Sequence, residues 1–268
     1  MDSVVSTKRD GKVLEITLNR PKVNAIDKAT SAALYEAFHT LQEDDDLLVG
    51  IITGTGRAFS AGWDLKAVAK AENQDDLDEL ESNESPGGFA GILEYWDLYK
   101  PVIGAINGFA IGGGFELALA TDIILAAEEA EFWLPEMERG FLASAGAIQR
   151  LPRRIPYNVC MELCWTGRHM SADEAKHWGL VSEVLPSDQL MDRSRELAQQ
   201  ISKGSPLATQ ALKAIMPVIM PLTIPEAMKK TQRGQSGNEM YERMMNSEDY
   251  FEGPRAFAEK RDPVFKGR

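Results

Sequence analysis

Three consecutive glycines followed closely by a glutamate are the first residues in the chain whose pattern points to chemistry. The triplet at 112–114 follows an apolar run, residues 102–106, and precedes Glu116. Glycines in a row give a core nothing to pack, so we interpret them as a place where backbone N–H groups approach a ligand closely. The first N–H groups of a helix lack intrahelical acceptors and bind anions. The segment therefore offers an anion site beside one carboxylate, although Glu116 can also be explained as a charge that complements the helix dipole.

A second carboxylate, Glu136, lies in a loop-like stretch with large apolar side chains, residues 131–137. Apolar surroundings disfavour the charged form of a carboxyl group, which raises its pKa towards that of a useful acid or base. The alternative interpretation is a surface glutamate beside a proline. The two glutamates together are candidates for acid–base chemistry.

Strands alternate with helices along the first part of the chain, which predicts an α/β fold with chemistry on the loops at strand ends. A buried strand at 47–53 is followed by a loop at 59–66, just as the strand at 102–106 is followed by the glycine triplet. Backbone amides from these two loops can therefore converge on one developing oxyanion. The predicted strands are residues 12–18 (half-buried), 47–53, 102–106 and 122–127. The predicted helices run from Asp27 to about Gln42, over 89–99, and onward from Gly113, Pro156, Ser171 and Ser205.

After about residue 150 the pattern becomes mainly helical, with prolines 217, 221 and 225 expected to break it. We therefore divide the chain into a core that carries the site, residues 1–200, and a helical C-terminal region, residues 201–268, that packs on neighbouring subunits. The acidic stretch at 70–88 is expected to be a mobile surface segment or, alternatively, a lid over a ligand.

Composition and missing motifs narrow the class of function. A net charge of −12 over 268 residues argues against nonspecific binding to nucleic acid or to an anionic membrane. No apolar run reaches the roughly 18 residues of a membrane span, and no signal peptide is evident. Two cysteines, Cys160 and Cys164, make no disulfide framework, so we expect a cytoplasmic protein. The three histidines are scattered and no H-E-x-x-H occurs, so we expect no metal.

Several motifs in order resemble the crotonase (enoyl-CoA hydratase/isomerase) superfamily over nearly the whole chain. They are SAGWDL at 60–65, NGFAIGGGFELALATD at 107–122, PE at 135–136 followed by Gly140, TGRHMSADEAKHWGLV at 166–181 and EGPRAFAEKRDPVFKG at 252–267. The resemblance implies a spiral of ββα units with a helical C-terminal region that builds homotrimers, often paired into hexamers. It also implies coenzyme A thioester substrates and no further cofactor, since coenzyme A is part of the substrate.

The resemblance assigns roles to individual residues. The backbone N–H groups of Trp63 and Gly113 match the oxyanion hole that holds a thioester enolate, and Glu116 and Glu136 match the two carboxylates that handle water and the α-proton. Phe257 and Lys260 match residues that, in some members, reach coenzyme A from a neighbouring subunit. The residues expected to bind substrate or coenzyme A are Ala61, Trp63, Asp64, Leu65, Lys66, Gly112, Gly113, Ser144, Phe257 and Lys260.

Holding both glutamates is the feature of hydratases within this superfamily, so the expected activity is reversible hydration of an α,β-unsaturated acyl-CoA. Within the superfamily, four segments most resemble members that act on carnitinyl-CoA, so the resemblance implies this substrate. They are SAGWDLKA at 60–67, PGGFAG at 86–91, GGGFELALA at 112–120 and SEDYFEGPRAFAEKRDPVFKGR at 247–268. The alternatives are a generic short-chain enoyl-CoA hydratase or Δ3,Δ2-isomerase and, more remotely, a noncatalytic acyl-CoA- or RNA-binding member. The loop after Glu136 departs from the family pattern, because Ala143 replaces a proline and Ser144 and Ala147 stand where glycines are common.

Overall fold

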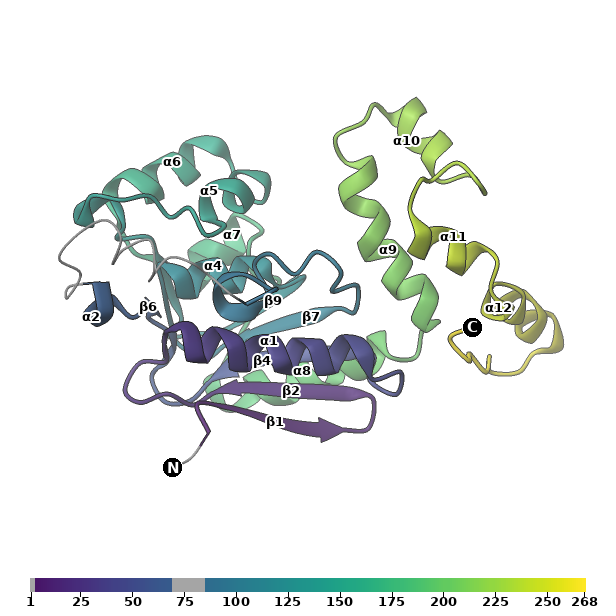
Figure 1. The fold of residues 1–268 in the computed structure, drawn as a ribbon, viewed down its shortest axis with the longest axis horizontal. Coiled ribbons are helices and arrows are strands. Elements are labelled where there is room, and N and C mark those ends of the chain that lie inside the picture. Colours follow the sequence, from purple (N-terminus) through teal and green to yellow (C-terminus); the bar gives the residue numbers. More distant parts are fainter. Residues whose placement is uncertain (1–2, 69–84) are drawn as a thin grey trace.

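The computed structural model describes residues 3–68 and 85–268 and contains a six-stranded, a four-stranded and a two-stranded sheet within those ranges (Figure 1). The six-stranded sheet has the order β1-β2-β4-β7-β9-β12 and is parallel except where β1 pairs with β2. The four-stranded sheet has the order β11-β10-β8-β5, and β3 pairs with β6. The strands are β1 (Val5–Asp10), β2 (Val13–Leu18), β3 (Ala25–Ile26), β4 (Val49–Gly54), β5 (Ala58–Ser60), β6 (Gly62–Trp63), β7 (Val102–Ile106), β8 (Phe109–Ile111), β9 (Ile123–Ala127), β10 (Glu131–Trp133), β11 (Met170–Ser171) and β12 (Glu183–Leu185).

The helices cover the sheets and then leave them. Figure 1 shows α1 and α8 beside the large sheet, whereas the chain from α9 to α12 extends to one side of the α/β part. None of the helices within the described ranges is long and apolar enough to cross a bilayer. The helices are α1 (Lys28–Glu43), α2 (Leu65–Val68), η1 (Phe89–Gly91), α4 (Gly113–Ala120), η2 (Met137–Arg139), α5 (Ala147–Arg150), η3 (Leu151–Arg153), α6 (Tyr157–Thr166), α7 (Ala172–His177), α8 (Ser187–Ile201), α9 (Pro206–Ile219), α10 (Ile224–Lys230), α11 (Glu239–Met245) and α12 (Glu248–Glu259).

Both faces of the large sheet are buried. Ile51 and Ile103 belong to an apolar cluster with Leu190 of α8, whereas Ile52 belongs to a second cluster with residues of α1. Helices on both faces are the usual cover of a parallel sheet, and strands inside it are buried on both sides. The prediction that the strand at 12–18 is half-buried is therefore wrong about burial. Strand β2 lies inside the sheet, between β1 and β4, and even its Glu15 is only 6% exposed.

Most predicted helix starts are confirmed by their caps. Asp27 accepts a hydrogen bond from the N–H of Thr30 at 2.8 Å, which begins α1 as predicted. Ser171 and Ser205 cap α7 and α9 in the same way. The glycine triplet also opens a helix, since Gly112 is the N-cap of α4.

Three local predictions are wrong. The loop predicted at 59–66 contains the short strands β5 and β6 and the start of α2. The helix predicted at 89–99 is only the single turn η1, because Gly88, Ala90 and Gly91 have positive φ, which a right-handed helix excludes. Pro217 lies inside α9 and does not end it. Most of the acidic stretch predicted to be mobile lies outside the described residues.

Helix α8 is tied to the sheet by an ion pair between the half-buried Arg195 and the buried Glu15, and variants of this pair test the packing. The Arg195 guanidinium donates to both oxygens of Glu15, at 2.7 and 3.1 Å, and this bond lowers the pKa of that carboxyl. We expect Arg195→Gln to lower the free energy of unfolding by about 1–3 kcal/mol, because Glu15 then stays buried without its partner. Arg193→Gln on the same helix, which loses a more exposed pair with Glu183, should cost less than about 1 kcal/mol. Urea unfolding of both variants measures the difference, and equal losses would contradict it.

Candidate active site

Three neighbouring strands of the small sheet bring the predicted site segments together. Strand β8 lies between β5 and β10 and is parallel to both, with Ser60 opposite Ala110 and Trp133 opposite Ile111. Because parallel strands end at the same edge of a sheet, the chain after each strand emerges on one side. The segments that follow these three strands contain Trp63, the glycine triplet and Glu136.

Two backbone amides converge where β6 meets the start of α4. A Cβ atom placed on Gly113 would lie 3.3 Å from the Trp63 nitrogen, and one placed on Gly62 would lie 2.6 Å from the Gly113 nitrogen. Gly62 has a φ of +75°, and Gly112, the N-cap of α4, has a φ of +51°. Glycine is needed at both positions because a side chain would strain the backbone, and at Gly62 it would also strike the neighbouring segment.

Neither of these N–H groups is used by the helix or strand in which it lies. Gly113 is the first residue of α4, where an N–H has no intrahelical partner. The N–H of Asp64 bonds to the Ile26 carbonyl at 2.9 Å, and alternation along a strand turns the N–H of Trp63 to the other side. The pair has the geometry of donors that stabilise one oxyanion.

Glu116 is a buried carboxyl that accepts hydrogen bonds from the backbone. It is 4% exposed, and its Oε1 accepts the N–H of Ala147 at 3.0 Å. Burial raises its pKa from the ordinary 4.5 to about 7; the Ala147 hydrogen bond opposes this rise, the charge of Glu136 adds to it, and Arg150 opposes it. A carboxyl with a pKa near neutrality can both take and give a proton at physiological pH.

Glu136 is also buried, and one of its oxygens has no partner. The residue is 8% exposed, burial raises its pKa, and its Oε2 makes no hydrogen bond with the part of the chain that the structure describes. Its Oε1 lies directly against Gly112, where any side chain would collide with it. A buried polar atom without a partner is costly, which marks this carboxyl as one prepared for a ligand or a water molecule.

The structure places the other predicted contacts unequally around these carboxyls. Ala61 and Asp64 flank β6, and Leu65 and Lys66 begin α2, so all four lie next to the oxyanion segment in the chain. The Asp64 carboxylate is engaged inside the protein by Arg20.

Two predicted contacts lie elsewhere in the chain. Phe257 is 87% exposed on α12, and Lys260 ends that helix with a left-handed backbone. Figure 1 shows α12 on the opposite side of the molecule from α2 and β6. These two residues therefore do not join Trp63 and Glu116 within one chain.

Three residues near the site were not singled out as functional by the sequence. Ala147 was noted only as a departure from the family pattern, yet its N–H binds Glu116. The ring of Phe89 lies against Gly113, and the motif PGGFAG was its available signal. No motif in the sequence marks Arg20, whose bond to Asp64 joins residues 44 positions apart.

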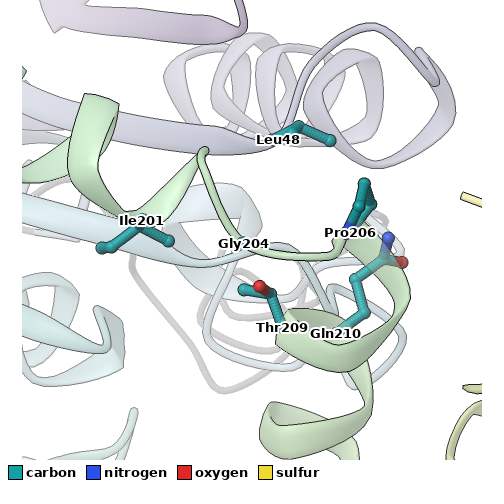
Figure 2. Close-up of a pocket in the computed structure, with 6 residues that line it drawn as sticks. All are labelled: Leu48, Ile201, Gly204, Pro206, Thr209 and Gln210. Carbon is teal, nitrogen blue, oxygen red and sulfur yellow. The ribbon is translucent and has the colours of Figure 1, made fainter. Parts of the chain in front are cut away.

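Cavities elsewhere in the structure do not include the carboxyls. One small cavity of about 10 Å³ lies where α8 connects to α9 and is lined by Leu48, Ile201, Gly204, Pro206, Thr209 and Gln210 (Figure 2). An open groove of about 980 Å³ lies along α9, with Leu212, Met216 and Met220 in its lining. Within residues 3–68 and 85–268, no group of three or more His, Cys, Asp or Glu side chains is placed to hold a metal ion.

Residues 8–268 match the family model described as enoyl-CoA hydratase/isomerase. The chain belongs to this family. It is 50% identical over 261 residues to carnitinyl-CoA dehydratases of Salmonella agona (strain SL483) and Salmonella choleraesuis (strain SC-B67), with 97% of each chain covered.

Solved structures of the family share the whole fold. The structure is similar to an enoyl-CoA hydratase from Mycobacterium tuberculosis H37Rv, with a TM-score of 0.87, 37% identity and 100% of both chains covered. It is also similar to an enoyl-CoA hydratase from Bacillus anthracis, with a TM-score of 0.88, 34% identity, and 99% of this chain and 100% of that chain covered. The crotonase fold expected from the sequence motifs is therefore confirmed.

The raised pKa of Glu116 predicts how stability depends on pH. The native protein holds this proton more tightly than the unfolded chain, so the associated stability is present below about pH 4.5 and is lost as the pH rises to about 7. We expect Glu116→Gln to gain stability relative to the native sequence between pH 5 and pH 8, by up to about 3 kcal/mol.

Denaturant unfolding at pH 5 and at pH 8 measures this gain in stability. Glu138→Gln changes an exposed carboxyl beside the same site and is the control, with a small effect expected at both pH values. A stability difference for Glu116→Gln that stays constant from pH 5 to pH 8 would contradict a buried group that titrates near neutrality.

Proposed function

We propose that this protein catalyses the reversible hydration of an α,β-unsaturated acyl-CoA thioester. The observation that carries the proposal is the pair of buried carboxyls, Glu116 and Glu136, beside the converging amides of Trp63 and Gly113. Membership of the enoyl-CoA hydratase/isomerase family supports the same chemistry. The reaction is a hydro-lyase reaction and consumes no cofactor, because coenzyme A belongs to the substrate.

Each carboxyl has a distinct proposed role in the addition of water. Glu116, whose ionised form accepts the Ala147 N–H, takes a proton from water as the water oxygen bonds to Cβ of the thioester. Glu136, whose pKa is raised by burial, delivers a proton to Cα from its protonated form. Glu116 gains one proton and Glu136 loses one. Proton exchange then returns both carboxyls to their starting states, so the net change is the addition of one water. Dehydration runs through the same steps in reverse.

The amides of Trp63 and Gly113 stabilise the charge that develops between these two proton transfers. As water adds to Cβ, electron density moves to the thioester oxygen and forms an enolate. Because these donors are already fixed at that oxygen, they need not reorganise during the reaction. Removal of one such donor typically lowers the rate by about 10²–10³-fold. The helix dipole of α4, whose N-terminus begins at Gly113, adds to the same stabilisation.

The acyl group proposed is carnitinyl, which becomes crotonobetainyl on dehydration. The supporting observation is 50% identity to relatives named carnitinyl-CoA dehydratase. The half-buried Trp63 side chain, next to its own oxyanion amide, offers an aromatic face for a trimethylammonium group, a contact worth roughly 0.5–2 kcal/mol. We propose that Ala61, Leu65, Lys66, Gly112 and Ser144 line the path of the thioester and coenzyme A. The exposed Lys66 is the cation in this group.

A substrate panel combined with two isosteric variants tests this function. We expect hydration of crotonobetainyl-CoA at a higher kcat/KM than crotonyl-CoA. Glu116→Gln and Glu136→Gln should each lose several orders of magnitude in kcat while still binding coenzyme A esters, because each variant keeps its shape but cannot transfer the proton. Glu138→Gln is the control and should retain activity.

Three results would contradict parts of this proposal. No turnover of either ester would reject the hydratase function. Turnover of crotonyl-CoA alone, or interconversion of double-bond isomers without hydration, would favour a generic enoyl-CoA hydratase or isomerase, the activities named in the family description. Near-native rates in either glutamine variant would remove that residue from the mechanism.

We further propose that the protein is a homotrimer or a hexamer in which Phe257 and Lys260 reach the site of a neighbouring subunit. The position of α12, at whose end they lie, on the opposite side of the molecule from α2 and β6 supports this arrangement (Figure 1). Large apolar side chains are also exposed along the C-terminal helices, where a neighbouring chain would cover them. They are Leu212, Met216, Met220, Ile224, Met228, Tyr250, Phe251 and Phe257.

Sedimentation equilibrium measures this assembly. We expect the mass of three or six chains of 29.6 kDa. The double variant Met220→Glu with Ile224→Glu should dissociate it, because it places charges on an apolar surface, whereas Met220→Leu should leave the mass unchanged. A monomer of the native sequence at micromolar concentration would contradict the proposal.

A further inference from the structure

The carboxylate of Asp64 is held inside the protein immediately after the oxyanion residue Trp63. Its Oδ2 accepts a hydrogen bond from Nη2 of Arg20 at 2.7 Å, and its Oδ1 accepts the N–H of Lys66 at 3.2 Å. The side chain is only 18% exposed, and the Arg20 bond holds the pKa of the Asp64 carboxyl below its ordinary value. Asp64 is therefore an ionised group whose charge is already neutralised by an arginine.

Arg20 connects Asp64 to two other elements. Its Nη1 donates to the carbonyl of Ala25 in β3 at 2.9 Å, and its Nη2 also lies 3.0 Å from Asp27, the N-cap of α1. The planar guanidinium holds its donors in a fixed fork, so these three contacts define the position of Asp64 relative to β3 and α1. The arginine side chain is itself only 25% exposed.

Within the described residues, few hydrogen bonds fix the direction of the oxyanion strand. Strand β6 has two residues, Gly62 and Trp63, and in the described part of the chain its one pairing partner is the equally short β3. On its N-terminal side, the Gly62 N–H bonds to Oγ of the buried Ser60 at 3.1 Å. On its C-terminal side, the anchors are the Asp64 N–H, bonded to Ile26, and the Asp64 side chain bonded to Arg20. A two-residue ladder is too short to hold its geometry alone.

We propose that Arg20 is a positioning residue of the oxyanion hole, which acts through Asp64 to hold the Trp63 N–H at the thioester oxygen. Asp64 then serves the backbone of its own strand instead of binding coenzyme A through its carboxylate. This inference rests on the hydration proposed above, in which the Trp63 amide stabilises the enolate.

Three variants separate this role from a contact with coenzyme A. We expect Arg20→Gln and Asp64→Asn each to lower kcat by about 10- to 100-fold, a part of what full loss of an oxyanion donor costs. KM and the dissociation constant of free coenzyme A should change less than about twofold, since the lost interaction is much stronger in the transition state than in the bound ester. The double variant should be no slower than the slower single variant, because both substitutions break one contact.

A spectroscopic measurement distinguishes positioning from a general loss of structure. A chromophoric α,β-unsaturated acyl-CoA should absorb at longer wavelength when the hole polarises its carbonyl, and this shift should be reduced in both single variants although the ester still binds. Arg20→Lys keeps the charge and the fold but not the fork, and should fall between the native protein and Arg20→Gln in both kcat and absorbance. Arg9→Gln, which also removes an arginine paired with two aspartates, Asp44 and Asp46, is the surface control and should match the native protein.

The proposal is overturned if Asp64→Asn weakens binding of free coenzyme A while kcat is kept, which would make Asp64 a ligand of coenzyme A. It is also overturned if the losses of the two single variants multiply in the double variant, or if the absorbance shift persists in a slow variant. Failure of the hydratase function is distinguishable, because the native protein would then turn over neither ester. The absorbance shift would still report whether Arg20 positions the amide.

Discussion

The close approach of two backbone segments, at Gly62 and at Gly113, is the constraint on which the site depends. A hydrogen bond from an amide reaches about 3 Å, so two amides serve one oxygen only when their backbones nearly touch. A Cβ atom on Gly62 would lie 2.6 Å from the Gly113 nitrogen, which leaves room for glycine alone. The parallel pairing of β5 with β8 brings both segments to one edge of the small sheet.

The same edge holds two carboxyls in surroundings that oppose their ionisation. Burial raises the pKa of both Glu116 and Glu136, and the unpartnered oxygen of Glu136 adds a further cost. Energetically unfavourable groups persist only where the surrounding structure fixes them strongly. Here the large parallel sheet, with apolar clusters on both faces, supplies a rigid core to which the small sheet is joined. The property that makes the carboxyls useful as acid and base is thus the one that costs stability.

Side chains compensate for the shortness of the strands that carry the site. Asn24 is 1% exposed and donates to the carbonyls of Thr55 and Ala58, while Ser60 donates to the Asn24 carbonyl at 2.7 Å and accepts the Gly62 N–H. Arg20 completes this set on the far side of Trp63. Buried, fully paired networks of this kind specify one backbone arrangement where a short ladder alone would allow several.

The sequence alone determined the features that depend on neighbours in the chain. Capping side chains such as Asp27 and Ser171 mark helix starts through local hydrogen bonds, the glycine triplet opens α4, and the motifs in order identify the fold. The three-residue strands β5, β8 and β10 were missed as strands, because so short a segment shows no periodicity and forms only by pairing with its neighbours.

Only the tertiary structure decided which groups meet. The Ala147 N–H reaches Glu116 across 31 residues and Arg20 reaches Asp64 across 44, and no local pattern encodes contacts between loops that a sheet juxtaposes. It likewise decided that α12, which contains Phe257, lies on the opposite side of the molecule from β6, which contains Trp63 (Figure 1). The roles of the two carboxyls and the two amides in catalysis stay predictions. Their convergence follows from the parallel order of three strands, a property of the folded chain and not of any one segment.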